Sequence, residues 1–242
     1  MISVAVIGAK GYIGSALCSA LYRLNVMTFP IDVNKLIAVI PIVRETYKAA
    51  KEGKYHILIN CAMPGSRYWA NNNLEKDYIE TVEKTQDIVN NWYYNKIIQI
   101  STISVRSDPT SIYAQHKAEA EEICRTKSNS LIYRLTSTYS PTLTRGILID
   151  MFKGKVFANG ENKYAFSSLD FVTNWIATHL DRFGLIELGA KNTISLQEIA
   201  DHLKLKVEFD GISETQDILN PESDYPDVKE VLTFMENYAK KM

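Results

Sequence analysis

An α/β fold with a doubly wound parallel sheet is predicted by three features of the sequence. Short apolar runs alternate with longer segments of helical periodicity over residues 1–140. The runs are apolar at every position and so have no polar face. Strands of this kind are covered by helices on both sides and form parallel sheets. A glycine-rich turn links the first run to the first helix. The pattern loosens after residue 140, so we expect residues 141–242 to form a small C-terminal part packed on the same domain.

Each element is predicted from its own pattern. An apolar run over 2–7 ends at Gly8 and predicts a strand, and residues 12–24 then place apolar side chains at helical spacing. Further apolar runs predict strands over 26–31, 36–40, 56–61, 96–101 and 131–135. Helical spacing predicts helices over 44–52, 74–94 and 113–126. In the C-terminal part we expect helices over 147–152, 169–182 and 195–203 and a short strand over 155–157.

Composition excludes several classes of protein. The 242 residues carry 27 Lys plus Arg against 28 Asp plus Glu, a net charge of −1, and 46% are hydrophobic. A chain of this length buries a sizeable core, and it lacks the basic excess that nucleic-acid binding requires. The three cysteines are far apart and do not cluster with the four histidines, so we expect no metal site and a reducing, cytoplasmic environment. The apolar runs are too short for a membrane span or a signal peptide, so we expect neither nucleic acid nor a membrane as a partner.

The turn after the first strand has the pattern GxxGxxG, formed by Gly8, Gly11 and Gly14. Gly8 permits a tight turn, Gly11 lets the backbone approach a pyrophosphate, and Gly14 lets the helix pack closely on the strand. The unpaired N–H groups and the partial positive charge at the start of a helix attract phosphate oxygens. The turn therefore predicts a Rossmann-type domain that binds a dinucleotide.

The identity of the dinucleotide is predicted from Asp32, at the end of the expected strand over 26–31. An acidic side chain there accepts hydrogen bonds from the adenosine ribose and repels a 2′-phosphate. No arginine lies between Arg23 and Arg44, although Lys35 is close. We therefore expect NAD, with NADP less favoured. The alternative is that Asp32 is only a polar residue in a turn.

A tyrosine and a lysine four residues apart lie on one face of a helix, where the ammonium lowers the pKa of the phenol and makes it an acid/base group. The chain has 14 tyrosines, so such pairs also arise by chance. They occur three times, as Tyr47/Lys51, Tyr113/Lys117 and Tyr225/Lys229. Only the second pair follows a strand whose carboxyl end brings hydroxyl groups to the sheet edge where α/β proteins bind ligands. We therefore expect Tyr113 and Lys117 to be the reactive pair.

Several segments, taken together, resemble the extended short-chain dehydrogenase/reductase superfamily, and within it the NAD-dependent epimerase/dehydratase family with its nucleotide-sugar 4-ketoreductases. They run from Ile2 to about Leu203 in the family's order: GAKGYIG, ILINCA, ISTISV, YAQHKAEAE, YRLTSTYSP and LGAKNTISLQEIADHL. The resemblance implies that Thr102 hydrogen-bonds the reacting oxygen, that Tyr113 is the acid/base, and that Lys117 is its partner and holds the nicotinamide ribose. Ser101 and Ser104 are close enough to replace Thr102.

The resemblance also implies contacts for the cofactor and the substrate. With Asp32 from the spacing above, the expected cofactor contacts are Gly8, Gly11, Tyr12, Ile13, Gly14, Cys61, Ala62, Tyr113 and Lys117. In relatives an Asn contacts the substrate where this chain has Ser137, and an Arg binds the nucleotide diphosphate where it has Tyr164. Lys163 or Arg145 is expected to serve the diphosphate instead.

Two departures from the family pattern bear on the reaction. Family dehydratases place Asp-Glu directly after the Thr, whereas this chain has Ile103 and Ser104, which do no acid/base chemistry near neutral pH. A 4,6-dehydratase is therefore disfavoured. The segment between Thr102 and Tyr113 is also short, so a loop that often covers the sugar in relatives is trimmed.

Relatives form a homodimer through two long helices that correspond to residues 74–94 and 113–126. The first of these predicted helices has an apolar stripe that suits such an interface: Tyr78, Val82, Thr85, Ile88, Val89 and Trp92. We expect a homodimer through these helices. The alternative is that the stripe packs inward on the sheet.

Together with the residues, the resemblance implies an NAD(P)-dependent enzyme that transfers a hydride at a carbon of a nucleotide-activated sugar while Tyr113 exchanges the hydroxyl proton. An epimerase is the first expectation. A 4-ketoreductase is the alternative, supported by the trimmed loop and by ILINCA, which resembles the 4-dehydrorhamnose-reductase branch. A dinucleotide sensor without catalysis is a further alternative, although a sensor has no need of the Thr102, Tyr113 and Lys117 set.

Overall fold

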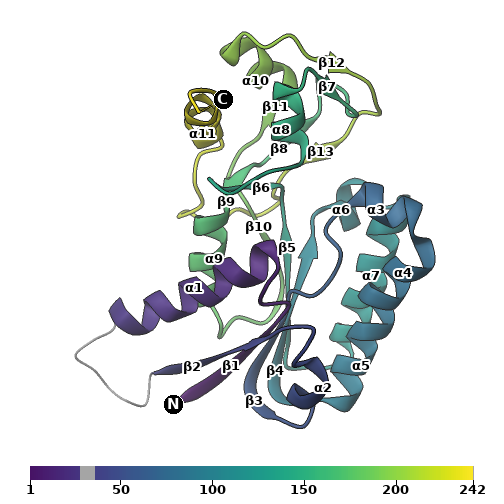
Figure 1. Cartoon of the computed structure of the whole chain (residues 1–242), viewed down its shortest axis with the longest axis vertical. Coiled ribbons are helices and arrows are strands. Elements are labelled where there is room, and N and C mark those ends of the chain that lie inside the picture. The colour runs from purple at the N-terminus through teal and green to yellow at the C-terminus, as the bar shows by residue number, and fades with distance from the viewer. Residues whose placement is uncertain (28–35, 242) are drawn as a thin grey trace. The chain divides into compact units, whose positions relative to one another are not determined.

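The computed structural model describes residues 1–27 and 36–241, and its central feature is a six-stranded sheet in the order β10-β5-β4-β3-β1-β2 (Figure 1). The strands are β1 (Ile2–Ile7), β2 (Ile37–Ile42), β3 (Lys54–Asn60), β4 (Tyr93–Thr102), β5 (Ser130–Leu135) and β10 (Gly184–Leu188). β1 pairs in parallel with both β2 and β3, and β3 pairs in parallel with β4. The strand order reverses between β1 and β3, and doubly wound sheets bind ligands at the carboxyl ends beside such a reversal. The predicted fold class is confirmed.

The chain forms two compact units. Unit 1 consists of Met1–Arg134 and Thr173–Ile186, and unit 2 consists of Leu135–Val172 and Glu187–Met242. The first change of unit, at residue 135, lies close to the boundary predicted at residue 140. The return of residues 173–186 to unit 1 was not predicted.

Helices cover both faces of the sheet in unit 1 (Figure 1). α1 (Tyr12–Met27) lies on one face, and α4 (Leu74–Tyr78), α5 (Lys84–Asn91) and α7 (Ile112–Arg125) lie on the other. Burial of the strand side chains between these layers provides the main stabilising free energy. One buried cluster joins strands to α5 and α7: Ala5, Ile7, Ile42, Tyr55, Leu58, Ile88, Val89, Trp92, Ile97 and Cys124. Three short helices occupy the connections: α2 (Tyr47–Ala50), α3 (Arg67–Asn72) and α6 (Ser104–Ser107).

The second strand that the structure describes corresponds to the apolar run predicted over 36–40. α1 continues to Met27, and β2 then pairs with β1 in the register Ile2↔Ile37 to Ile7↔Ile42. The side chain of Asn25 fixes the start of β2, because its Nδ2 donates to Ile37 O (2.7 Å) and its Oδ1 accepts from Ile37 N (2.9 Å). The predicted strand over 26–31 is therefore wrong in its first two residues, and Asp32 lies outside the described residues.

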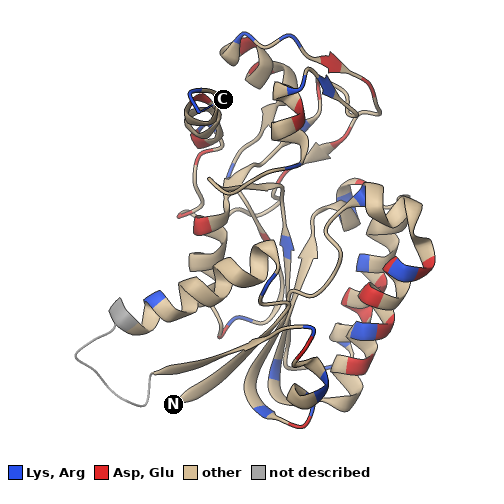
Figure 2. Cartoon of the chain, viewed as in Figure 1, with Lys and Arg blue, Asp and Glu red and all other residues tan. Residues whose placement is uncertain are grey.

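The helix predicted over 74–94 is divided in the structure. A π-helical turn, η2 (Ile79–Glu83), separates α4 from α5, and Tyr93 and Tyr94 already belong to β4. Apart from Tyr78, every residue of the expected stripe is at most 6% exposed: Val82, Thr85, Ile88, Val89 and Trp92. The stripe thus packs inward on the sheet and does not support the homodimer, which stays a prediction. Lys, Arg, Asp and Glu residues lie along the same group of helices (Figure 2).

Unit 2 combines short strands with helices. Its strands include β6 (Thr138–Tyr139), β7 (Lys155–Val156), β8 (Lys163–Tyr164), β9 (Ser167–Ser168), β11 (Ile194–Ser195), β12 (Glu208–Phe209) and β13 (Thr215–Gln216). α8 (Ile147–Phe152) has the predicted bounds, and α10 (Leu196–Leu203) begins after a capping box between Ser195 and Glu198. α11 (Glu230–Ala239) was not predicted, and α9 (Leu169–Thr178), which passes from unit 2 into unit 1, ends before residue 182. No helix within residues 1–27 and 36–241 is long and apolar enough to cross a membrane.

Candidate functional site

The glycine turn between β1 and α1 is built for close backbone contacts. Gly8 has a φ of +83°, which favours glycine, and a Cβ there would lie 2.9 Å from the Cα of Ala62. A Cβ at Gly14 would collide with the carbonyl oxygen of Gly8. Gly11 N donates to Gly8 O (2.8 Å), which closes the turn before α1 begins at Tyr12. The first N–H groups of a helix have no acceptor within the helix, so the turn and α1 together fit the pyrophosphate of a dinucleotide.

The carboxyl end of β3 lies beside this turn, at the reversal of strand order. Cys61 N donates to Ile7 O (3.0 Å), and Ala62 N donates to Asn60 Oδ1 (3.1 Å). Cys61 and Ala62 are half-buried, Tyr12 is exposed and Ile13 is half-buried. The structure therefore brings together the cofactor residues predicted from the glycine turn and from the end of β3. Their contact with a cofactor stays a prediction.

β4 and α7 bring Thr102, Tyr113 and Lys117 together. α7 begins after Ser111, whose Oγ accepts a hydrogen bond from Ala114 N (3.3 Å), and this start places Tyr113 and Lys117 one turn apart. Tyr113 is 9% exposed, Lys117 is 4% exposed, and Lys117 Nζ lies 5.3 Å from the centre of the Tyr113 ring. Thr102, the last residue of β4, hydrogen-bonds the Tyr113 side chain. The predicted set is thus assembled at one place, at the carboxyl end of β4.

Burial controls the proton affinities of this pair. It raises the pKa of Tyr113 to about 12, although the hydrogen bond with Thr102 and the positive charge of Arg67 lower it. Burial also lowers the pKa of Lys117 to about 7, and the carboxylate of Asp77 raises it. Tyr113 is therefore protonated near neutral pH, whereas Lys117 changes its charge there.

The two serines that could replace Thr102 have partners of their own, and Ser104 also hydrogen-bonds Thr102 itself (3.2 Å). Ser101 Oγ donates to Glu121 Oε1 (2.6 Å), and Glu121 is buried and paired with Arg134 (2.7 Å). Ser104 Oγ accepts a hydrogen bond from Arg67 (2.8 Å). Within the described part of the chain, Thr102 is the one of these three hydroxyls that hydrogen-bonds Tyr113.

The other two tyrosine–lysine pairs have structural partners. Tyr47 OH (3.3 Å) and Lys51 Nζ (2.6 Å) both donate to the carboxylate of Asp87. Tyr225 is 2% exposed, and its hydroxyl donates to the backbone oxygen of Glu187 (2.9 Å). These contacts explain why the spacing alone does not identify the reactive pair.

Three charged or titratable residues near the set were not predicted. Arg67 begins α3, bonds Ser104 and pairs with Asp108 (3.4 Å). Asp77 of α4 is completely buried and lies 2.6 Å from His116 of α7. His116 stands inside the YAQHK segment and could have been singled out by its position. Asp77 and Arg67 carry no sequence signal, because only the packing of α3 and α4 brings them here.

The predicted substrate residues all lie in unit 2. Tyr164 is 4% exposed and stacks on Phe166, with ring centres 5.1 Å apart. Ser137 is half-buried and donates to Gln216 Oε1 (3.5 Å), and Lys163 and Arg145 are exposed. Tyr164 therefore packs inside unit 2. The contact of these residues with a substrate stays a prediction.

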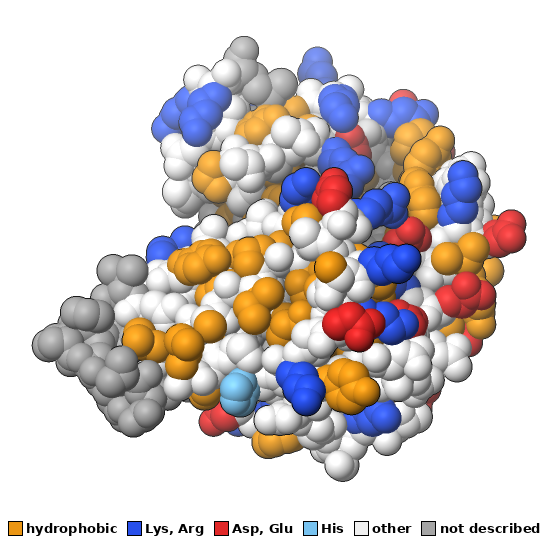
Figure 3. Space-filling view, turned by 60° about the horizontal axis from the view of Figure 1, so that its bottom comes forward, with side chains coloured by type: hydrophobic (Ala, Val, Ile, Leu, Met, Phe, Trp, Pro, Cys, Tyr) orange, Lys and Arg blue, Asp and Glu red, His pale blue; other side chains and the backbone are white. Residues whose placement is uncertain are grey.

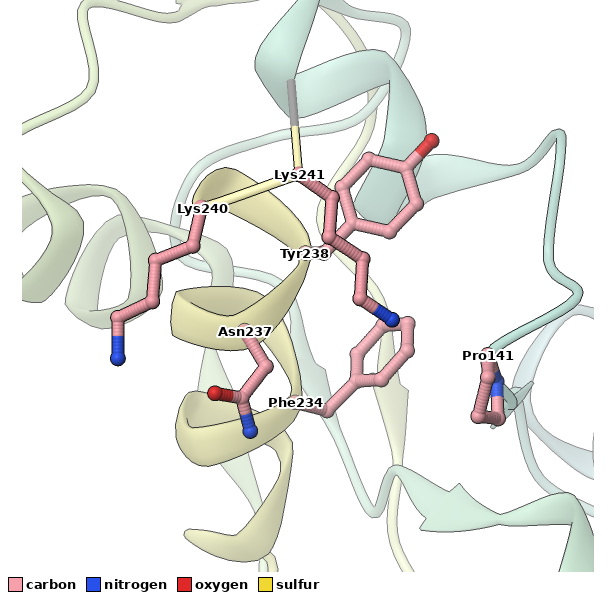
Figure 4. A pocket seen from close by; sticks show the side chains of 6 residues that line it. All are labelled: Pro141, Phe234, Asn237, Tyr238, Lys240 and Lys241. Atoms are coloured by element: carbon pink, nitrogen blue, oxygen red, sulfur yellow. The ribbon is translucent and has the colours of Figure 1, made fainter.

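Two pockets are lined by residues outside the predicted sets. One lies along α11 in unit 2, and Figure 4 shows its lining: Pro141, Phe234, Asn237, Tyr238, Lys240 and Lys241. The other lies at the amino ends of the strands of unit 1, where apolar side chains gather (Figure 3), and is lined by Ile2, Ile37, Ile57, Lys96, Leu180, Asp181 and Phe183. Within the described part of the chain, no group of three or more His, Cys, Asp or Glu residues could hold a metal ion.

Solved structures resemble this chain over nearly its whole length. A dTDP-4-dehydrorhamnose reductase from Clostridium acetobutylicum has 15% identity and a TM-score of 0.75, with 99% of this chain and 100% of that chain covered. The enzyme of the same name from Bacillus anthracis, in complex with NADP, has 14% identity and a TM-score of 0.72, with 98% and 99% covered. A UDP-galactose 4-epimerase has 15% identity and a TM-score of 0.71, with both chains covered completely. At these identities the likeness shows the fold.

The family follows from the sequence itself. No curated protein matches the chain. The model of the NAD dependent epimerase/dehydratase family matches residues 4–166, which include the glycine turn and the Thr102, Tyr113 and Lys117 set. The chain therefore belongs to the NAD-dependent epimerase/dehydratase family of NAD(P)-dependent enzymes.

Proposed function

We propose that the chain reduces a keto group on a nucleotide-activated sugar, with NADPH as the preferred hydride donor. The observation that carries the proposal is the set formed by half-buried Thr102 with buried Tyr113 and Lys117, which lies at the carboxyl end of β4. The residues after Thr102 support reduction rather than dehydration, because Ile103 is completely buried and Ser104 is bonded to Arg67. Neither can take a proton from a sugar carbon.

The chain's own residues account for the proton in this reaction. When bound, the reduced nicotinamide supplies a hydride to the carbonyl carbon. Tyr113, which holds its proton near neutral pH, donates it to the carbonyl oxygen, so that the C=O bond becomes an alcohol. Thr102 hydrogen-bonds the phenol and orients it, and the ammonium of Lys117 stabilises the phenolate that remains. The phenolate then regains a proton from water.

The preference for NADPH is inferred from the end of β2. Gly8 N (3.0 Å) and Ala9 N (3.2 Å) both donate to Ile42 O, so the last residue of β2 lies against the glycine turn. Arg44 follows two residues later, and its side chain is 82% exposed and pairs with Glu80 (2.9 Å). An arginine at this point of a dinucleotide-binding sheet accommodates the 2′-phosphate of NADP. The expectation of NAD depended on an acidic residue, Asp32, at the end of a strand. β2, the described strand beside the glycine turn, ends at Ile42, two residues before Arg44.

Replacing Arg44 by Ala should weaken NADPH binding about 10- to 100-fold and leave NADH binding nearly unchanged, because a charge-assisted contact with the phosphate is lost. Fluorescence titration of both cofactors measures the two dissociation constants. Lys48→Ala, which removes an exposed cation of α2, is the matched control and should change neither constant. Equal weakening of both cofactors in Arg44→Ala would contradict the assignment.

The reaction itself is tested with a 4-keto nucleotide sugar and NADPH. We expect nicotinamide absorbance to fall in a one-to-one ratio with the alcohol formed. Interconversion of two sugars without net loss of reduced cofactor would instead establish an epimerase. Tight cofactor binding without turnover across a panel of nucleotide sugars would establish a sensor.

A further inference from the structure

A buried carboxylate stands next to the reactive pair without a role in the chemistry described so far. Asp77 is 0% exposed, and its Oδ2 lies 2.6 Å from Nδ1 of His116. Its other oxygen, Oδ1, accepts no hydrogen bond from any described residue. A buried carboxylate is costly unless charge or hydrogen bonds compensate it, so a second compensating group is needed.

The positions of α4 and α7 identify that group. His116 and Lys117 are neighbours on α7, and α7 contacts both α4 and η2. The negative charge of Asp77 raises the pKa of both Lys117 and Tyr113. The π-helical turn η2 begins two residues after Asp77, and such turns are frequent at functional sites because they displace one helical turn relative to the next.

Among the described charged groups near Lys117, Asp77 is the carboxylate that is not already paired with an arginine. Arg67 from α3 is positive and acts on Tyr113, and Glu121 on α7 is neutralised by Arg134 and Arg125. His116 is 14% exposed and meets the edge of the Tyr78 ring, with centres 5.3 Å apart. Among the described residues, Asp77 is the buried carboxylate whose negative charge raises the pKa of Lys117, and its hydrogen bond with His116 (2.6 Å) holds it in place.

We propose that Asp77 and His116 form a positioning pair that keeps Lys117 positively charged and oriented toward Tyr113. The pair acts through Lys117 and touches no reacting atom, so this inference rests on the proposed function. Its expected consequence is an activity that persists to higher pH than a buried lysine alone would allow.

The test is the pH dependence of kcat in the variant Asp77→Asn, which keeps the shape of the side chain and removes its charge. Loss of the carboxylate lowers the pKa of Lys117 further below its value of about 7, so the alkaline decline of kcat should move to lower pH by about one unit. At high pH, kcat should fall about tenfold, and at low pH it should approach that of the unchanged protein. The midpoint of the decline does not depend on the fraction of folded enzyme, so partial unfolding does not mimic the shift.

Further variants distinguish the effect of the Asp77–His116 pair from the effect of removing any charge or side chain on α7. Glu119→Gln removes an exposed carboxylate from the same helix and should leave the midpoint unchanged. His116→Phe removes the donor to Asp77 and should shift the midpoint in the same direction as Asp77→Asn, and His116→Gln, which retains an N–H donor, should restore part of it. The double variant Asp77→Asn with His116→Phe should shift no more than Asp77→Asn alone, because both changes act through one interaction.

The proposal is overturned if the midpoint stays in place in Asp77→Asn, or if Glu119→Gln moves it equally. A second readout does not need turnover: NMR titration of the lysine side chains, with the Lys117 signal assigned by its loss in Lys117→Met. If the unchanged protein reduces no sugar, the proposed function fails. The pair is still tested by whether Asp77→Asn lowers the titration midpoint of Lys117.

Discussion

Replacing Tyr113 by Phe should lower turnover about 100- to 10,000-fold while cofactor affinity stays within about twofold. The substitution removes only the hydroxyl that donates the proton and keeps the buried ring, which is 9% exposed. Thr102 loses its hydrogen bond with Tyr113 but keeps those with Ser104, and the turn that fits the dinucleotide is unchanged. Single-turnover absorbance kinetics and fluorescence titration of NADPH measure the two effects separately.

Tyr47→Phe is the matched control, since Tyr47 also precedes a lysine by four residues. Its hydroxyl bonds Asp87, outside the proposed site, so turnover should be unchanged. Loss of turnover in both variants would indicate damage to the fold. Unchanged turnover in Tyr113→Phe would remove Tyr113 from the mechanism.

Replacing Gly14 by Ala should lower the free energy of unfolding by about 3 kcal/mol and abolish dinucleotide binding. The added Cβ would collide with the Gly8 oxygen, lie 2.8 Å from the Gly8 carbonyl carbon and 3.3 Å from the Cα of Ala9. These are backbone atoms, so a side-chain rotation cannot relieve the overlap, and the turn itself must move. Urea denaturation followed by tryptophan fluorescence measures the loss of stability.

Gly65→Ala provides the comparison for this variant. A Cβ there would meet no atom within 4 Å, so the change should alter stability by less than about 0.5 kcal/mol. Equal stability of both variants would show that the close packing at Gly14 is not required. Retained NADPH affinity in Gly14→Ala would contradict the role of the turn in binding.

Local sequence patterns were sufficient to predict those helices, strands and turns whose structure depends mainly on their own residues. The apolar run of β1, the glycines that follow it and the helical spacing of α7 each predict the observed element. The order of these elements along the chain also predicts the parallel sheet, because the connections leave few other topologies. For the same reason Tyr113 could be selected from three candidate tyrosines before its burial was known.

The position of β2 and the pairing of Asp77 with His116 depend on contacts between distant parts of the chain, which the sequence pattern does not show. Residues 26–31 and 36–40 are both apolar and suit a strand, and the contact of Asn25 with Ile37 together with the register on β1 places β2 at Ile37–Ile42. That placement puts Arg44 two residues after the end of β2, and the proposal of NADPH depends on this position. Asp77 and His116 are far apart along the chain, and only the packing of α4 on α7 makes them a pair.

The most direct test of the account follows a deuterium label from the reduced nicotinamide to the sugar. NADPH that carries deuterium at the transferred position is mixed with a 4-keto nucleotide sugar, and mass spectrometry measures the label in the sugar product. We expect each product molecule of the unchanged protein to gain one deuterium, and Tyr113→Phe to form almost no labelled product in the same time. A sugar that changes without gaining the label, or that does not change at all while NADPH remains bound, would contradict hydride transfer as the reaction of this chain.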